Sequence, residues 1–143
     1  MTKTMAGNIA RWFAVLPGAA LAMVASSFPL HLVLYQTLTG SGIVEPYPEA
    51  PERLLGPLVA TLAFVWAGSR IAPNNKVQAA VALFGLMLLG SGASLALAVS
   101  GAHFGNTGYY LRMGGLPVAA GIAGAFIGLY IAYRENGAGR GSI

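Results

Sequence analysis

The sequence contains no cysteine. The chain therefore has no disulfide, no thiolate metal ligand, no iron–sulfur cluster and no thiol nucleophile, which excludes several classes of enzyme. It also lacks the Gly-rich loop between a strand and a helix that binds phosphate, and it offers no Ser–His–acid arrangement. We therefore expect no catalytic residue.

Charged residues are also scarce. Only 8% of the 143 residues are charged, against about 25% in an ordinary soluble domain. By contrast, 56% are hydrophobic and the mean hydropathy is +0.67, so water is not the main solvent of this chain. The length allows one domain with at most four or five membrane-spanning helices of about 20 residues each.

Four long apolar segments predict membrane-spanning helices. They cover approximately residues 12–38, 54–72, 77–100 and 114–133. We predict an all-α fold, an integral membrane four-helix bundle in which antiparallel up-down helices are joined by short loops. The whole chain, residues 1–143, forms a single membrane domain. No internal repeat supports a repeat-built transporter.

The first apolar segment is longer than one crossing requires. A kink at Pro29 or tilting of the helix is expected to absorb the excess. A cleaved signal peptide is the alternative interpretation, because the segment has a basic start and small residues follow. We favour a retained helix, because the apolar run continues past Pro29 to Tyr35 instead of giving way to polar sequence.

Two connectors interrupt the apolar pattern. Residues 43–53 hold three of the four acidic residues and three of the eight prolines, which predicts an extended and solvated segment. Residues 101–113 are rich in glycine and aromatic side chains, as a loop at a membrane surface should be. We expect both connectors at the same surface.

The eight cations divide unequally between the two ends of the predicted helices. Arg53 and Arg112 lie at one end, and the other end carries the remaining six: Lys3, Arg11, Arg70, Lys76, Arg134 and Arg140. The positive-inside rule then predicts cytoplasmic termini and outward-facing connectors, and we expect location in a bacterial inner (plasma) membrane. The cations form no basic stripe, so the net charge of +4 does not indicate a nucleic-acid partner.

Small residues predict close helix packing in two of the helices. The fourth helix carries a stripe at strict four-residue spacing: Ala120, Gly124, Gly128 and Ala132. In the third helix, Gly90 and Ser94 lie among other small residues. Such faces allow backbones to approach closely where lipid supplies no hydrophobic drive. We expect these residues to contact other membrane proteins or a second copy of the chain, with Tyr47 and Glu49 of the outward connector forming a second contact.

The two histidines are the candidates for a metal or haem site. His31 lies inside an apolar helix, where an unpaired ionisable group is costly. His103, Glu45 and Glu49 fall on the same predicted side, so zinc or copper could bind there. No two of these four residues have the short spacing of typical metal sites. We therefore predict no cofactor and interpret His31 as structural, while a partner contact, proton handling, and metal or haem ligation stay open.

These patterns together favour a non-catalytic integral membrane protein, an accessory or structural subunit of a larger membrane complex. Two alternatives stay open. A small carrier or channel for an apolar or lipid-like solute would need no buried charge. A redox membrane subunit would bind metal or haem through His31 and His103.

Overall fold

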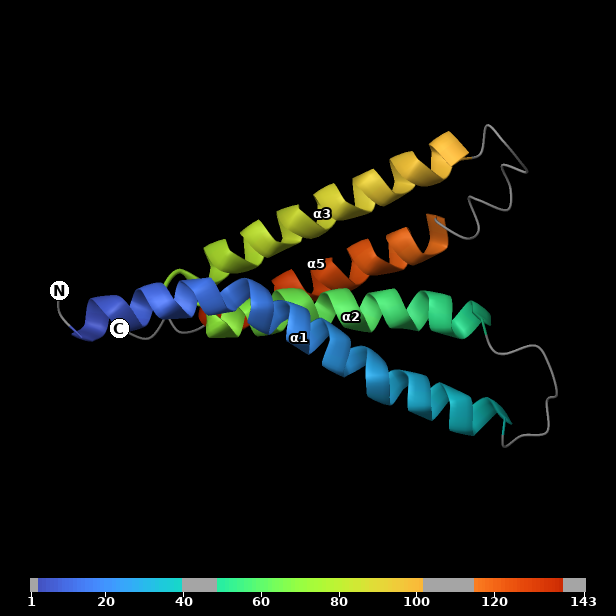
Figure 1. Cartoon of the computed structure of the whole chain (residues 1–143), viewed down its shortest axis with the longest axis horizontal. Helices are drawn as coiled ribbons and strands as arrows, with labels where there is room; N and C mark the ends of the chain where they lie inside the picture. The colour runs from blue at the N-terminus through green and yellow to red at the C-terminus, as the bar shows by residue number, and fades with distance from the viewer. Residues whose placement is uncertain (1–2, 40–48, 102–114, 138–143) are drawn as a thin grey trace.

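The computed structural model describes residues 3–39, 49–101 and 115–137, and these residues form four long helices. They are α1 (Lys3–Thr39), α2 (Glu49–Ile71), α3 (Lys76–Gly101) and α5 (Leu116–Gly137), labelled as in Figure 1. Each helix contains a segment long and apolar enough to cross a membrane: Gly7–Leu34, Arg53–Ile71, Lys76–Leu97 and Leu116–Asn136. The prediction of an all-α chain with four such helices is confirmed.

The helices extend beyond the apolar segments that predicted them. α1 begins at Lys3 rather than near residue 12, and α5 continues to Gly137. Both extensions include polar residues, because a helix can continue past the apolar segment that hydropathy detects.

The start of α2 corrects the prediction for the first connector. α2 begins at Glu49, so residues 49–53 are helical, and the prediction of an extended segment is wrong for them. Pro51 is compatible with this start because the first turn of a helix has no use for its missing N–H. Residues 43–48 of this connector, and residues 102–113 of the second, lie outside the described residues.

Consecutive helices run in opposite directions, but the four do not form a closed ring. The start of α1, the end of α5 and the α2–α3 turn lie at one end of the molecule, the terminal end, and the opposite end is the far end (Figure 1). The backbone of α2 approaches those of all three other helices, and most extensively that of α5. Within the described residues, the backbone of α1 comes close to α2 alone. α2 is therefore the central helix, and its main partner α5 runs parallel to it.

The buried core lies toward the terminal end and consists mainly of small side chains. Alanine dominates it, and the full set is Val15, Ala19, Phe64, Val65, Ala72, Ala79, Ala80, Leu83, Ala125 and Ala132. In an 18-residue apolar stretch of each helix, 33% of the residues are buried in α2 and in α5, against 11% in α1 and in α3. The α2–α5 pair is therefore the packed centre, and α1 and α3 lie at its sides.

The helices separate toward the far end. Figure 1 shows α3 diverging from α2, and the second half of α1 turning away from α2. α1 contains Pro17 and Pro29, and each removes a backbone hydrogen bond, which permits such a bend. Phe28, Leu32 and Val33 in this half of α1 are exposed. The far half of the molecule is thus less packed than the terminal half.

Candidate functional site

The small-residue stripe of α5 packs against α2. A side-chain carbon at Gly124 would overlap the carbonyl group of Leu58, and one at Gly128 would come within 2.8 Å of the Leu62 carbonyl oxygen. Ala120 and Ala132, the other two residues of the stripe, are buried. The stripe therefore packs a helix as expected, but that helix belongs to the same chain, and its face is not open to another protein.

Thr61 links the same two helices through its hydroxyl group. Its Oγ1 lies 2.7 Å from the carbonyl oxygen of Gly121 on α5 and 2.8 Å from that of Pro57 on its own helix. The single hydroxyl hydrogen can be donated to either acceptor. Because Thr61 is buried, this bond joins α2 to α5 in a region that excludes water.

An ion pair closes the α2–α5 interface at the terminal end. Arg70 donates to Glu135 through Nη2 at 2.7 Å and through Nε at 3.1 Å, a bidentate arrangement. The guanidinium also lies 5.2 Å from the centre of the Trp66 ring, within the range of a cation–π contact. Both charged side chains are substantially exposed, so the pair contributes little to stability.

A cleft lies between α2, α3 and α5, and Thr61 is one of the residues that line it. Its volume is about 420 Å³, and we call it the α2–α3–α5 cleft. Its walls are Pro57 and Thr61 of α2, Leu86, Met87, Gly90, Ser91 and Ser94 of α3, and Pro117, Val118 and Gly121 of α5. Gly90 and Ser94, which the sequence marked as a packing face, therefore line a cleft within the chain.

Two hydroxyl groups in this cleft have no hydrogen-bond partner among the described residues. Five other serine and threonine side chains of the described helices donate to a backbone carbonyl: Ser26, Ser27, Thr61, Ser69 and Ser100. Ser91 and Ser94 make no such bond, although a serine in an apolar helix normally bonds back to its own turn. The cleft thus combines apolar walls with two available hydroxyls.

The outward face of α3 lies opposite the core. At 100° per residue, Gly85, Gly92 and Ala96 fall within about 40° of one another and roughly opposite the buried Ala80 and Leu83. A side-chain carbon at Gly85 or Gly92 would meet nothing within 4 Å, and Leu89 between them is 75% exposed. We call Gly85, Leu89, Gly92 and Ala96 the outward face of α3.

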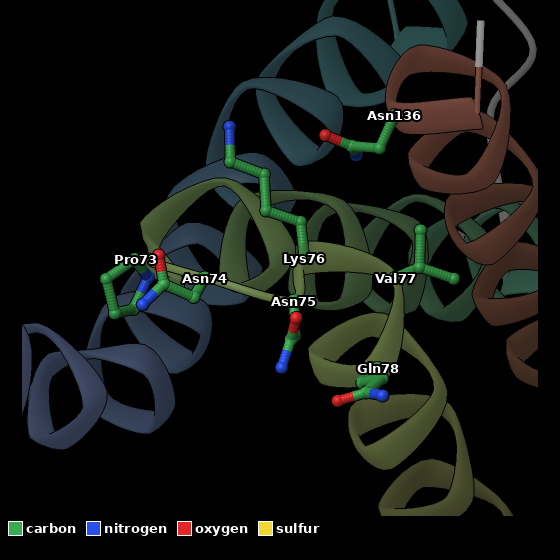
Figure 2. A pocket seen from close by; sticks show the side chains of 7 residues that line it. All are labelled: Pro73, Asn74, Asn75, Lys76, Val77, Gln78 and Asn136. Carbon is green, nitrogen blue, oxygen red and sulfur yellow. The ribbon is translucent and has the colours of Figure 1, made fainter. Parts of the chain in front are cut away.

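A second, polar hollow of about 340 Å³ surrounds the α2–α3 turn. It is lined by Pro73, Asn74, Asn75, Lys76, Val77, Gln78 and Asn136. Figure 2 shows that these side chains do not converge, because Lys76 extends toward Asn136 whereas Asn75 and Gln78 point the other way. Asn75 has a φ of 52°, in the left-handed region that asparagine tolerates, and its carbonyl accepts the first hydrogen bond of α3 from Ala79. These residues therefore form the α2–α3 turn, and their side chains do not converge on a binding site.

The candidate metal ligands are not brought together by the described part of the chain. His31 is exposed on the second half of α1 and lines neither of the two hollows. Glu49 is the first residue of α2, and Glu45, Tyr47 and His103 lie outside the described residues. Among the described residues no three histidine, aspartate or glutamate side chains are placed to hold a metal ion. The metal and haem alternatives stay predictions.

Sequence reasoning missed three residues that the structure brings forward. Glu135 is the partner of Arg70, Ser91 lines the cleft, and Thr61 bonds to Gly121 across two helices. The contacts of these residues depend on how α2 and α5 align in parallel, or on how far α3 diverges from α2. Local sequence patterns encode neither arrangement. A polar residue within an otherwise apolar run was the only available signal for Thr61 and Ser91.

No protein-family model, no curated protein and no solved structure matches this chain. The function therefore has to be argued from the geometry described above.

Proposed function

We propose that this protein is a non-catalytic subunit of a larger membrane complex, and that the outward face of α3 packs against a transmembrane helix of a partner protein. The observation that carries this proposal is the open space over Gly85 and Gly92, both on the side of α3 that faces away from the core.

Small residues on this face favour a helix over lipid as the neighbour. Lipid chains contact large apolar side chains as readily as small ones, whereas a helix backbone approaches closely only over glycine or alanine. The α2–α5 pair gives an internal precedent, because Gly124 and Gly128 lie directly beneath the backbone of α2. On α3, Gly85, Gly92 and Ala96 present a comparable surface with Leu89 as a side chain that could insert between turns of a partner helix.

We include an orientation in the proposal, with both termini in the cytoplasm and the far end facing outward. Its support is the unequal distribution of cations, six toward the terminal end and two toward the far end in sequence. A bacterial inner membrane is the setting that we propose for this arrangement.

A photo-crosslinking experiment tests the partner surface. A photoactivatable residue replaces Leu89 in one version of the chain and Phe13 of α1 in another, two positions that are 75% and 80% exposed. After irradiation of native membranes, we expect a discrete crosslinked species from position 89 alone. Two differently tagged copies of the chain in the same cells reveal whether the species is a homodimer or contains another protein.

A matched pair of substitutions controls the experiment. Gly92→Leu covers the outward face and should abolish the crosslink, whereas Gly90→Leu fills the cleft on the opposite side of α3 and should leave it unchanged. Equal crosslinking from positions 89 and 13, or no effect of Gly92→Leu, would refute the proposed partner surface. A crosslink to a second copy of the chain would show that this face mediates self-association and does not bind a different partner protein.

A further inference from the structure

We infer that the α2–α3–α5 cleft is a lipid-binding site, which holds one hydrocarbon chain of a diacyl glycerolipid while the ester carbonyl of that lipid accepts a hydrogen bond from Ser94 or Ser91.

The length and depth of the cleft match one leaflet of a bilayer. Along α3 the cleft extends from Leu86 to Ser94, which is about 12 Å at ~1.5 Å per residue. One leaflet contributes about 15 Å of hydrocarbon. Leu86 lies near the middle of the apolar stretch Lys76–Leu97 of α3, and Ser91 and Ser94 lie about 7.5 Å and about 12 Å further toward the far end at ~1.5 Å per residue. Ser94 is therefore the serine nearer to the ester groups of the far leaflet, and the apolar wall continues from there toward the bilayer centre.

The volume of the cleft fits a single hydrocarbon chain. Such a chain is about 4–5 Å across at van der Waals contact and occupies roughly 200 Å³ over a length of about 12 Å. The cleft of about 420 Å³ accommodates that chain together with its ester group. It also falls within the range of about 300–1,000 Å³ that small-molecule sites occupy.

The lining distinguishes a lipid site from a gap that merely collects solvent. Leu86, Met87 and Val118 provide apolar contact, and the Met87 side chain can adapt to an irregular chain. The Thr61 hydroxyl is already committed to backbone carbonyls, so the donors left for a ligand are Ser91 and Ser94. A carbonyl oxygen is an acceptor only, and it would satisfy a serine donor that otherwise faces hydrocarbon.

Native mass spectrometry of the full chain released from a mild detergent tests this site. The probes are a diacyl phosphatidylglycerol and its dialkyl ether analogue, which has the same chains and headgroup but no ester carbonyl. We expect the wild-type chain to retain one diacyl lipid, and to bind the ether lipid about threefold to tenfold more weakly, the range of one hydrogen bond.

Two substitutions locate the lipid. A side-chain carbon at Gly90 would meet no atom within 4 Å, and Gly90 lines the cleft, so the fold of Gly90→Leu should persist while lipid retention is lost. Gly92→Leu makes the same change on the opposite side of α3 and should retain the lipid. The Ser91→Ala/Ser94→Ala chain should bind the ester and ether lipids equally, and circular dichroism checks the helix content of every variant.

Three results would overturn the inference. They are a wild-type chain that retains no lipid under these conditions, a Gly90→Leu chain of wild-type helix content that retains as much as Gly92→Leu, and an equal preference of the wild-type chain for the ether and ester lipids. The site and the proposed partner surface can fail separately, because Gly90→Leu tests one and Gly92→Leu tests the other.

Discussion

α5 and α3 carry similar small-residue patterns in opposite surroundings. On α5, Gly124 and Gly128 lie so close to the backbone of α2 that neither has room for a side chain. On α3, Gly90 and Gly92 meet nothing within 4 Å on either side of the helix. The same sequence signal thus describes an interface already formed inside the chain and a surface still open. Small residues at helical spacing predict that a backbone can approach, and they carry no information about which backbone does so.

The largest expected difference between the two helices comes from adding a side chain to each. Gly124→Leu should destabilise the protein by about 3 kcal/mol or more, because the new side chain forces α5 away from α2. Gly92→Leu, which enters open space, should change the free energy of unfolding by less than about 0.5 kcal/mol.

Unfolding in mixed micelles with increasing denaturing detergent, followed by circular dichroism, measures both Gly→Leu variants. Equal stability of these two variants would show that the close α2–α5 approach is not a stabilising interface.

A smaller effect separates the hydroxyls of the two interfaces. Thr61→Val removes the bond to the Gly121 carbonyl while preserving the side-chain shape, and should cost roughly 0.6–1.7 kcal/mol, the range for interhelical hydrogen bonds in membranes. Thr61→Ser keeps the hydroxyl and should lose less. Ser94→Ala removes a hydroxyl that bonds to no described residue, so the delipidated protein should keep its stability within about 0.5 kcal/mol. The same unfolding assay decides the matter, and a larger loss for Ser94→Ala than for Thr61→Val would reverse the comparison.

The smallest effect concerns the ion pair that joins the α2 and α5 ends. Glu135→Gln removes one charge from the bidentate contact with Arg70, and the midpoint of unfolding should fall slightly at low salt. The difference from wild type should vanish at high salt, because screening weakens contacts between exposed charges. A salt-independent loss would indicate that Glu135 contributes through packing instead.

The sequence was sufficient for the four helices and not for their arrangement. Long apolar runs identified each of the four helices, because about 20 apolar residues make a helix long enough to cross a bilayer. α2 begins at Glu49, some five residues before the predicted start, although Pro51 is suited to the first turn of a helix. The stripe from Ala120 to Ala132 was recognised as a packing face, but its partner α2 lies some 60 residues earlier, and no periodicity specifies a pairing at that separation. The cleft was unpredictable for the same reason, because it depends on how far α3 diverges from the α2–α5 pair.

The parallel pairing of α2 with α5 has a consequence for how the chain is made. Because α3 lies between them in sequence, the ribosome completes α2 and α3 before the partner of α2 exists. Until α5 has been synthesised, the face of α2 that includes Leu58, Thr61 and Leu62 has no cover from α5. The most extensive interface therefore cannot form before α5 has been synthesised.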